Sequence, residues 1–543
     1  MKKTILGLFS LLLVLVLSAC GGSNSETTGD EGNSADKKVV RYNLQENPAQ
    51  LDPQLNTEQV SGNVLGHIME GLTTLGADGN PIPGVAESWT SEGNTWTFKL
   101  RKDAKWHNGD PVVAGDFTAA WERALNPATA SEYSYIMYSI KGAQEYNEGK
   151  TKDFATVGVK ATDDYTIVVD LKEPVAYFAS LVSFYTYMPQ NQKFFEEHKE
   201  TYATSAEDVM GNGPFKLISW EFENKIIVEK ADTYWNKDSI KIDTIEMAMV
   251  ADRSSALKAY QNGELDWIKL SPDEVAKFKA DPEMKPYEDG SVWYLMLNNK
   301  EKLFSNKKVR KAIALSIDRQ ALVEKVKAGS GVAAYSFVPS VIPGKKGFFR
   351  EDYDAKAYGI TYNPEEAKKL FAEGLAELGM TAADVKTISL VANGTDVAQK
   401  EAQFYQEQLK VSLGLDVKIE PVTQQIRVQR MTAKDYQIVL AGWGPDYNDP
   451  MTYMDLWLSN SGQNNSNWAS KEYDSLIASA KVEADPAKRM DLMAQAEKLL
   501  MDELPIVPTF FRQENALIRS NIKGVVDRAL SPSTDFRFAN MEK

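Results

Sequence analysis

The sequence contains almost no cysteine and very little histidine. Its only cysteine is Cys20, so an internal disulfide framework is excluded. The three histidines, His67, His107 and His198, lack the spacing of zinc ligands, and we expect no metal site. An excess of basic charge is also missing, because 61 Lys and Arg residues face 76 Asp and Glu residues, for a net charge of −15. No Lys/Arg cluster resembles a phosphate-binding surface, so nucleic acid is not an expected partner.

Long apolar runs are absent after residue 17, as are short repeats and low-complexity tracts in the body of the chain. The composition, 43% hydrophobic, 25% charged and 10% aromatic, is typical of a folded globular protein and argues against disordered and polytopic membrane classes. A chain of 543 residues is longer than one hydrophobic core organises. The length therefore predicts about two to four domains.

The N-terminus has the pattern of a targeting segment. Lys2 and Lys3 precede an apolar stretch at 5–17, which is too short to span a bilayer of about 30 Å and predicts a signal-peptide core. The following residues, Leu-Ser-Ala-Cys-Gly at 17–21, resemble the lipobox of bacterial lipoproteins. The resemblance implies cleavage after residue 19 and lipidation of Cys20. The alternative is an ordinary secretory cleavage site beside a chance cysteine.

The segment 21–38 has the composition of a flexible linker. It contains no aromatic residue and no aliphatic residue larger than alanine, so it cannot pack a core. As a flexible coil, its 18 residues reach about 20–25 Å. We therefore expect a lipid-tethered protein on the outer side of the cell membrane, with a tether long enough to let the body reorient.

The remaining sequence alternates between strand and helix patterns. Alternating apolar residues predict strands at 95–100, 165–171 and 225–230. Asn363 and Pro364 predict the start of a helix that runs to Gly379, with Glu366 completing a capping box. A second helix is expected to begin at 485–486, and Pro505 is expected to end it. Strands and helices mixed over this length indicate an α/β fold.

The segment 100–123 carries a turn at 108–111 and then a helix that we expect Asp116 to cap. Together with the motifs at 51–53, 70–72 and 83–89, it resembles the peptide, dipeptide and nickel group of periplasmic-type solute-binding proteins, also called family 5. The resemblance extends from residue 40 to the C-terminus. We interpret the aromatic and proline residues of this segment as structural rather than ligand-binding: Trp106, Pro111, Phe117 and Trp121.

The resemblance implies a type II periplasmic-binding-protein fold of the α/β class, with two main lobes joined by two hinge strands and an extra third domain. The apolar segments 291–295 and 508–511 are the expected hinge strands. The implied division is a signal peptide at 1–19, a lipidated cysteine and linker at 20–38, a discontinuous lobe I at 39–70, 201–288 and 511–543, a domain II at 71–200, and a lobe III at 289–510.

The segment 442–450, Gly-Trp-Gly-Pro-Asp-Tyr-Asn-Asp-Pro, is the candidate binding loop. It follows a buried-strand pattern at 438–441, and ligands of open α/β sheets commonly bind beyond the carboxyl ends of strands. Its two glycines permit close approach of another backbone, Trp443 offers an aromatic wall, and Asp446 supplies an anion. The alternative is a structural loop in which Asp446 makes an Asx-turn and Trp443 fills a core.

Oligopeptide-binding members of the family carry a matching segment, and the resemblance implies a role for each residue. Asp446 would pair with the α-ammonium group of a peptide, and Gly442 and Gly444 would pair with its main chain. Trp443 would line a side-chain pocket, and Tyr447 is a further ligand-binding candidate of the same segment. More remote resemblances add two further ligand-binding candidates, Gln59 and Tyr133.

The sequence departs from enteric relatives at the other end of the ligand. Those relatives place arginines upstream of the tryptophan, where they meet a peptide carboxylate, whereas Met431 and Leu440 occupy these places here. Arg427 or Arg430 is a possible substitute, and the sequence does not distinguish them.

The resemblance implies that the protein captures oligopeptides between two lobes and delivers them to the permease and ATPase subunits of an ABC importer. The alternatives within the family are a dipeptide, a pheromone peptide, haem or a nickel chelate. A secreted hydrolase is a further alternative, but HExxH and GxSxG motifs are absent, and so is a phosphate-binding loop. We expect a monomer that is not an enzyme and that needs no cofactor.

Overall fold

The computed structural model of this protein describes residues 37–385 and 387–542. The expected signal peptide, the expected lipidation of Cys20 and nearly all of the expected linker lie outside the described residues. The described elements belong to one compact unit, Lys38–Lys543. The predicted α/β class is confirmed, because this unit mixes strands and helices along its whole length.

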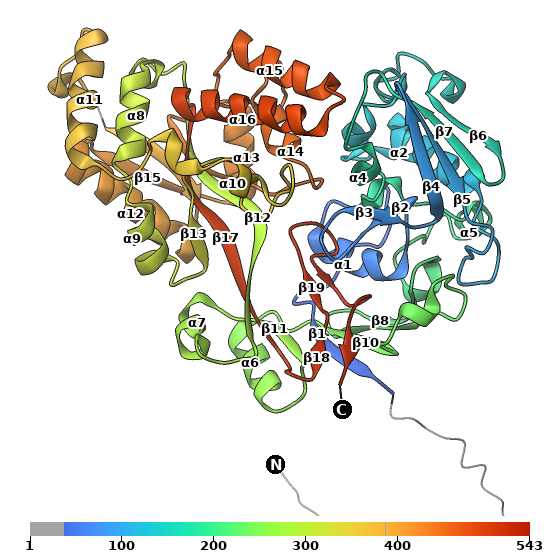
Figure 1. The fold of residues 1–543 in the computed structure, drawn as a ribbon. Helices are drawn as coiled ribbons and strands as arrows, with labels where there is room; N and C mark the ends of the chain where they lie inside the picture. Colours follow the sequence, from blue (N-terminus) through green and yellow to red (C-terminus); the bar gives the residue numbers. More distant parts are fainter. Residues whose placement is uncertain (1–36, 386, 543) are drawn as a thin grey trace, which may run out of the picture. The chain divides into compact units, whose positions relative to one another are not determined.

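One large mixed sheet organises the unit (Figure 1). Ten of its strands form one path, and β13 (Gly331–Ala333) pairs with β17 beside that path. The path runs in this order: β15 (Val417–Val422), β14 (Ile388–Asn393), β16 (Ile438–Trp443), β12 (Met284–Leu297), β17 (Ile506–Ile518), β11 (Trp267–Lys269), β1 (Val39–Asn43), β10 (Thr244–Ala248), β9 (Lys225–Lys230) and β8 (Phe215–Glu221).

Two long antiparallel strands, β12 and β17, connect the two ends of this sheet (Figure 1). They have 14 and 13 residues and contain the segments expected to be hinge strands. The later part of β12 pairs with β16, whereas the end of β17 pairs with β11. Their register shifts between Glu288 and Val292. These two strands therefore join the β14–β16 end of the sheet to the β1–β10 end.

A separate antiparallel sheet is formed by β4 (Ala86–Glu92), β5 (Thr95–Leu100), β7 (Thr166–Asp170) and β6 (Val159–Asp163), in that order. The predicted strand at 95–100 is confirmed with the same bounds, and its alternation places Trp96, Phe98 and Leu100 in the core. Helix α2 (Ala114–Leu125) contacts β6. The short strands β2 (Thr73–Leu75) and β3 (Pro81–Pro83) form a hairpin beside it.

Helices cover the strands and enclose three hydrophobic clusters. The cluster around β14 and β16 includes residues of α8 (Lys307–Leu315), α11 (Pro364–Glu377) and α12 (Asp396–Leu413). A small cluster beside β11 includes residues of α6 (Arg253–Gln261) and α7 (Pro272–Phe278). The largest cluster joins the antiparallel sheet to α1 (Gln59–Ile68), α15 (Lys471–Val482) and α16 (Pro486–Glu503).

The remaining α-helices and β-strands of the described residues are short. They are α3 (Ala143–Asn147), α4 (Phe178–Leu181), α5 (Gln192–Glu197), α9 (Arg319–Ala321), α10 (Phe349–Asp352), α13 (Gln424–Thr432), α14 (Met451–Met454), β18 (Ile522–Lys523), β19 (Val526–Asp527), β20 (Thr534–Asp535) and β21 (Asn540–Met541). Among the helices of 37–385 and 387–542, none has the length and apolar character needed to cross a membrane.

Two predicted helix starts are confirmed, with one correction. The Asn363 side chain accepts a hydrogen bond from the amide of Glu366 at 3.1 Å, and α11 begins at the next residue, Pro364. The predicted capping box is not formed, because the carboxylate of Glu366 lies 3.7 Å from Lys369 instead. Asp485 caps α16 through the amides of Ala487 and Lys488.

The prediction that Asp116 caps α2 is wrong. The helix begins two residues earlier, at Ala114, so Asp116 lies in its first turn. The carboxylate of Asp116 turns back and accepts hydrogen bonds from the amide of Val113 and the indole of Trp106, each at 3.0 Å. The structural interpretation of this segment is otherwise supported, because three aromatic residues predicted to be structural are fully buried: Trp106, Phe117 and Trp121.

Candidate functional site

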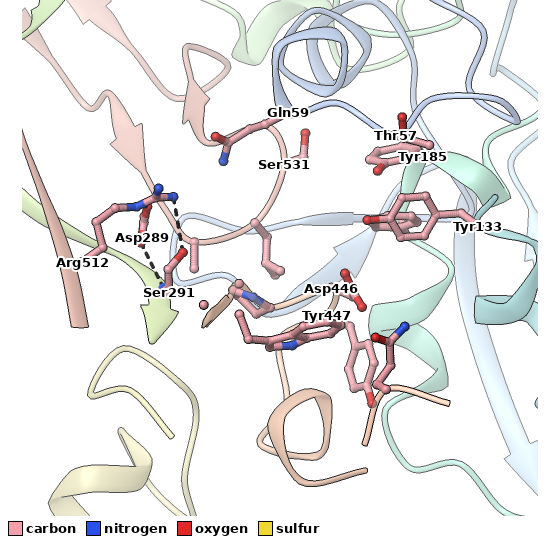
Figure 2. A pocket seen from close by; sticks show the side chains of 18 of the residues that line it. Thr57, Gln59, Tyr133, Tyr185, Asp289, Ser291, Asp446, Tyr447, Arg512 and Ser531 are labelled. Atoms are coloured by element: carbon pink, nitrogen blue, oxygen red, sulfur yellow. Dashed lines mark hydrogen bonds and ion pairs between the residues drawn. The ribbon is translucent and has the colours of Figure 1, made fainter. Parts of the chain in front are cut away.

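A cavity of about 960 Å³ lies beside the end of β16 (Figure 2). Most of its walls come from parts of the chain that are distant in sequence. These are the start of α1, the aromatic segments around 132–135 and 180–185, the middle of β12 and β17, the loop after β16, and the segment 529–531. Its volume is at the upper end of the roughly 300–1,000 Å³ that small-molecule sites occupy.

All seven residues predicted to bind a ligand line this cavity. They are Gln59, Tyr133, Gly442, Trp443, Gly444, Asp446 and Tyr447. Five of them belong to one loop, so their proximity follows from the sequence. Gln59 is the first residue of α1, and Tyr133 directly precedes a short 3₁₀ helix at Ser134–Met137. Only the tertiary fold brings these two residues to the loop. The structure thus collects the predicted residues in one place.

The end of β16 leaves part of its backbone unpaired. On one edge β16 pairs with β12 as far as Trp443. On the other edge it pairs with β14 only at Ile438 and Val439. No described strand continues that pairing toward Gly442, so this edge resembles the exposed edge to which an extended peptide can add a strand.

The two glycines of the loop have different surroundings. A Cβ at Gly442 would lie 2.9 Å from atoms of the Trp293 indole, so this glycine makes room for a side chain of the neighbouring strand. Trp293 also lines the cavity and stacks on Phe510 at a centroid distance of 6.2 Å. At Gly444 the nearest atom to an added Cβ is the Ser291 hydroxyl at 3.4 Å. Only Gly442 is therefore required by close packing of the protein itself.

Asp446 is a carboxylate without a cationic partner. Its amide donates to Thr452 Oγ1 at 3.1 Å, and the Tyr135 hydroxyl lies 3.5 Å from its Oδ2. No Lys or Arg of the described residues forms an ion pair with it. Burial, followed by the charge of Asp455, raises the pKa of Asp446 to about 7. A group at this position gains most from a ligand cation, because such a cation would stabilise its charged form.

The loop is held in place from behind by a second aspartate. The carboxylate of Asp449 accepts two hydrogen bonds from the Arg489 guanidinium, at 2.7 and 2.8 Å, and the two residues are only 6% and 3% exposed. Arg489 belongs to α16, so this ion pair connects the loop to a helix. The Asn448 amide donates to the carbonyl of Gly79 at 2.7 Å and connects the loop to the β2–β3 hairpin.

The aromatic residues of the loop form a wall. Tyr447 is buried and stacks on Tyr177 with ring centroids 4.6 Å apart and planes 2° apart. Its hydroxyl donates to the carboxylate of Asp455 at 3.2 Å. The buried indole N–H of Trp443 has no acceptor among the residues that the structure describes.

An aromatic cluster faces Asp446 across the cavity (Figure 2). Tyr133 lies against Tyr135, Phe184 and Tyr185, with ring centroids 5.7, 5.1 and 5.8 Å apart respectively. Burial, with a further contribution from the charge of Asp446, raises the pKa of Tyr133 to about 12. These hydroxyls therefore stay protonated in neutral solution and can donate hydrogen bonds. Gln59 is exposed to the cavity at the start of α1.

The structure separates the two arginines that the sequence left undistinguished. Arg430 is bound by Glu420 at 2.7 Å and does not line the cavity. Arg427 is buried and lines the cavity, and its guanidinium donates to Asn393 Oδ1 at 2.9 Å and to the carbonyl of Leu440 at 3.1 Å. Within the described residues it has no carboxylate partner, and burial lowers its pKa. Arg427 is thus a second charge of the cavity that lacks a counter-ion.

Sequence reasoning missed a polar group on β12 and β17. The carboxylate of Asp289 binds the guanidinium of Arg512 and accepts a hydrogen bond from the Ser291 amide at 2.9 Å. These residues lie apart from Asp446 in the cavity (Figure 2). The acidic residues and the glycine at 288–290, directly before an expected hinge strand, are the sequence feature from which this polar group could have been predicted. Tyr185, in an aromatic run at 184–187, was missed in the same way.

The described residues contain no group of three or more His, Cys, Asp or Glu side chains placed to hold a metal ion. The cavity instead combines an unpaired anion, an unpaired cation, a free strand edge and aromatic walls. Such a set suits an extended ligand with charged ends and a repeating hydrogen-bonding backbone.

Comparison with known proteins relates this chain to bacterial solute-binding proteins. The family described as bacterial extracellular solute-binding proteins, family 5 Middle, matches residues 80–465. The oligopeptide-binding protein OppA of Bacillus subtilis (strain 168) is 37% identical, over 95% of this chain and 95% of its own. The dipeptide-binding protein DppE of the same organism is 35% identical, again over 95% of each chain.

Solved structures agree with these relationships. Listeria monocytogenes OppA bound to peptide is 34% identical, with a TM-score of 0.75 over 94% of this chain and 100% of that one. Haemophilus influenzae OppA in complex with RPPGFSPFR is 31% identical, with a TM-score of 0.74 over 94% and 99% of the two chains. The predicted type II periplasmic-binding-protein fold is confirmed by this similarity.

Proposed function

This chain belongs to family 5 of the bacterial extracellular solute-binding proteins, and we propose that it captures oligopeptides with a free amino terminus for import. The observation that carries the proposal is Asp446, a carboxylate in a large cavity without a cation to pair with. A peptide α-ammonium supplies that cation. Because leaving either charge buried and unpaired costs several kcal/mol, the pairing discriminates strongly against blocked peptides.

The peptide main chain would lie along the free edge of β16. Main-chain hydrogen bonds exist for every peptide sequence, so the edge near Gly442 and Gly444 supplies affinity without selecting side chains. The aromatic side chain of Trp443 lines the cavity beside this edge and can pack against the peptide. The cavity volume of about 960 Å³ favours a peptide of several residues over a dipeptide.

Arg427 would take a carboxylate of the ligand. It is the cation of the cavity without a carboxylate partner among the described residues, whereas Arg512 is bound by Asp289 and Arg430 lies elsewhere. A planar guanidinium can bind a carboxylate through two parallel hydrogen bonds. In this arrangement a peptide is held at its amine by Asp446 and at an anionic group by Arg427.

Capture would involve closure of two lobes about β12 and β17. The proposed lobes are lobe I at 39–70, 201–288 and 511–543 and lobe III at 289–510, with domain II at 71–200. Closure about hinge strands encloses ligands in proteins of this general design. A ligand shifts the open–closed equilibrium only by its difference in affinity for the two states, so contacts from both lobes are required.

The closed form would deliver its peptide to the permease of an ABC importer, with energy from separate ATPase subunits. Cys20 would carry the lipid that attaches the protein, as a monomer, to the outer face of the cell membrane. Stable attachment requires two or more acyl chains. Mass spectrometry of the membrane-extracted protein tests this part, because lipidated Cys20 would be the first residue of the mature chain.

The experiment for the central proposal is calorimetry with a peptide and its N-acetylated form. We expect acetylation to weaken binding at least about 30-fold, because it removes the ammonium from a buried pair. Asp446→Ala should weaken the free peptide to a similar degree and make the two forms bind alike. Glu132→Gln is the matched control, because Glu132 is an exposed carboxylate of the same cavity and its loss should change affinity less than about threefold.

Equal binding of free and acetylated peptides by the unmodified protein would disprove the amine anchor. Absence of binding by any member of a mixed library of peptides would disprove oligopeptide capture itself. Mass spectrometry of the same incubation should recover intact peptides, and cleavage products would instead support a hydrolase.

A further inference from the structure

A second cavity of about 670 Å³ lies on the other side of the candidate loop. It shares a wall with the first cavity, formed by Tyr135, Trp443, Asp446, Tyr447 and Gln463. The rest of its lining comes from 136–139, 172–181 and 452–481. Asp446 therefore faces two cavities, and a ligand group bound to it can send atoms into both.

The second cavity has apolar walls and an acidic corner. Val175, Leu181 and Leu456 are among its apolar lining residues. Asp455 also lines it, and the Tyr447 hydroxyl donates to Asp455 at 3.2 Å. Like Asp446, Asp455 has no ion pair among the described residues. Burial raises the pKa of Asp455 to about 6, and the charge of Asp455 contributes to the raised pKa of Asp446.

The cations near this corner are already engaged or more distant. Lys172 is exposed and lies 3.8 Å from Glu145. Lys481 lines the cavity and lowers the pKa of Asp455 through its charge, but it lies beyond ion-pair distance. The corner thus holds two carboxylates, Asp446 and Asp455, that form no ion pair within residues 37–385 and 387–542.

The covalent structure of a peptide connects these observations. The α-ammonium and the side chain of the first residue branch from the same carbon atom. If the ammonium binds Asp446 and the main chain follows β16 into the first cavity, the side chain of the first residue has the second cavity available. Its apolar walls suit the methylene part of a long side chain, and Asp455 suits a cationic end.

We propose that the second cavity is a specificity pocket for the first residue of the peptide, and that Asp455 selects Lys or Arg there. This inference rests on the proposed function, because it takes the amine at Asp446 as given. Asp455 acts by pairing with the ligand side chain, and the Tyr447 hydroxyl donates a hydrogen bond to its carboxylate. Lys481 opposes the selection by repelling the same cation.

The test uses pooled peptides of three to six residues whose first residue is Lys, norleucine or Glu and whose other positions are randomised. Norleucine has the methylene stem of Lys without its charge. Affinity selection with mass spectrometry should enrich the Lys pool about tenfold over the norleucine pool, the magnitude of a hydrogen bond to a charged group. The Glu pool should bind weakest. Calorimetry on one enriched peptide and its norleucine analogue then measures the same ratio.

Two variants test whether Asp455 causes the preference for Lys over norleucine. Asp455→Asn keeps an acceptor for the Tyr447 hydroxyl and should reduce the Lys-to-norleucine ratio to about one. Lys481→Met should increase the ratio, because it removes a repelling charge. Both variants should retain the preference for free over acetylated peptides, which depends on Asp446.

Enrichment ratios within twofold for the unmodified protein would overturn the inference, as would a Lys preference that survives in Asp455→Asn. If these results occur while free peptides still bind better than acetylated ones, the amine anchor stands and only the specificity pocket fails. If no pool binds, the proposed function fails and the specificity pocket fails with it.

Discussion

Asp446 and Asp449 lie three residues apart in one loop, yet the structure places them in opposite situations. Asp449 is 6% exposed and receives two hydrogen bonds from Arg489, at 2.7 and 2.8 Å. Asp446 faces two cavities and has only the Tyr135 hydroxyl at 3.5 Å near its carboxylate. The same residue type is thus paired where the chain supplies a cation, and is left in a cavity without a cationic partner among the described residues where it does not.

The difference explains how the loop can be held firmly in place and still carry one unpaired carboxylate. The Asp449–Arg489 ion pair and the contact of Asn448 with Gly79 connect the loop to α16 and to the β2–β3 hairpin. These contacts hold Asp446 in position before any ligand arrives. A preorganised charge loses little conformational entropy on binding, which increases affinity.

The largest expected effect comes from removing the structural aspartate. Asp449→Ala leaves the guanidinium of Arg489 buried without its partner, and we expect a loss of about 3–5 kcal/mol in the free energy of unfolding. Denaturant unfolding measures this loss. Asp446→Ala is the matched control and should not destabilise the protein. Similar losses for the two variants would contradict the division of roles.

The next effect is a pH dependence of peptide binding whose acidic limb we assign to Asp446. The pKa of Asp446 is about 7 in the free protein, and a bound ammonium would hold it much lower. Affinity should therefore fall as the pH falls below about 7, by about tenfold per pH unit, because a proton must leave Asp446 before the ammonium can bind. It should also fall above about pH 8, where the peptide amine loses its proton.

Calorimetry between pH 5 and pH 9 measures this profile. Asp455 titrates in a neighbouring range, with a pKa of about 6, so a variant is needed for the assignment. Asp446→Asn should remove the acidic limb. An acidic limb that persists in this variant would assign the titration to another group.

The smallest expected effect concerns the stability of the ligand-free protein. The pKa of Asp446 is raised in the folded state, so the folded protein binds its proton more tightly than the unfolded chain does. Asp446 should therefore reduce stability progressively as the pH rises from about 4 to 7, and the reduction should persist above pH 7. Asp446→Asn should be more stable than the unmodified protein at pH 8, by about 1 kcal/mol because the side chain is only half-buried, and equally stable at pH 4. Thermal unfolding at the two pH values checks the sign, and greater stabilisation at pH 4 would contradict it.

Local sequence patterns predicted the elements well where a single segment carries the signal. The strand at 95–100 and the start of α11 at Pro364 follow from alternation and from capping chemistry within a few residues. Asp116 shows the limit of such reasoning. Its carboxylate accepts hydrogen bonds from both the Val113 amide and the Trp106 indole, but the helix begins two residues before it, so Asp116 is not the capping residue.

The candidate site was predicted in part for the same reason. Five residues of one loop could be found together, and a resemblance pointed to Gln59 and Tyr133. The polar group of Asp289 and Arg512 joins two strands that are more than two hundred residues apart. The second cavity also needs segments from 136 to 481, so no local pattern could reveal it.

The sequence by itself was sufficient to predict a targeting segment at the N-terminus, the α/β class and the loop that carries Asp446. The tertiary structure decided which charges are paired. Asp449 pairs with Arg489 and Arg430 pairs with Glu420, while Asp446 and Arg427 line the cavity without a counter-ion in the part of the chain that the structure describes. The physical reason is that pairing requires approach within a few ångströms, and residues forty positions apart reach that distance only through the packing of whole elements.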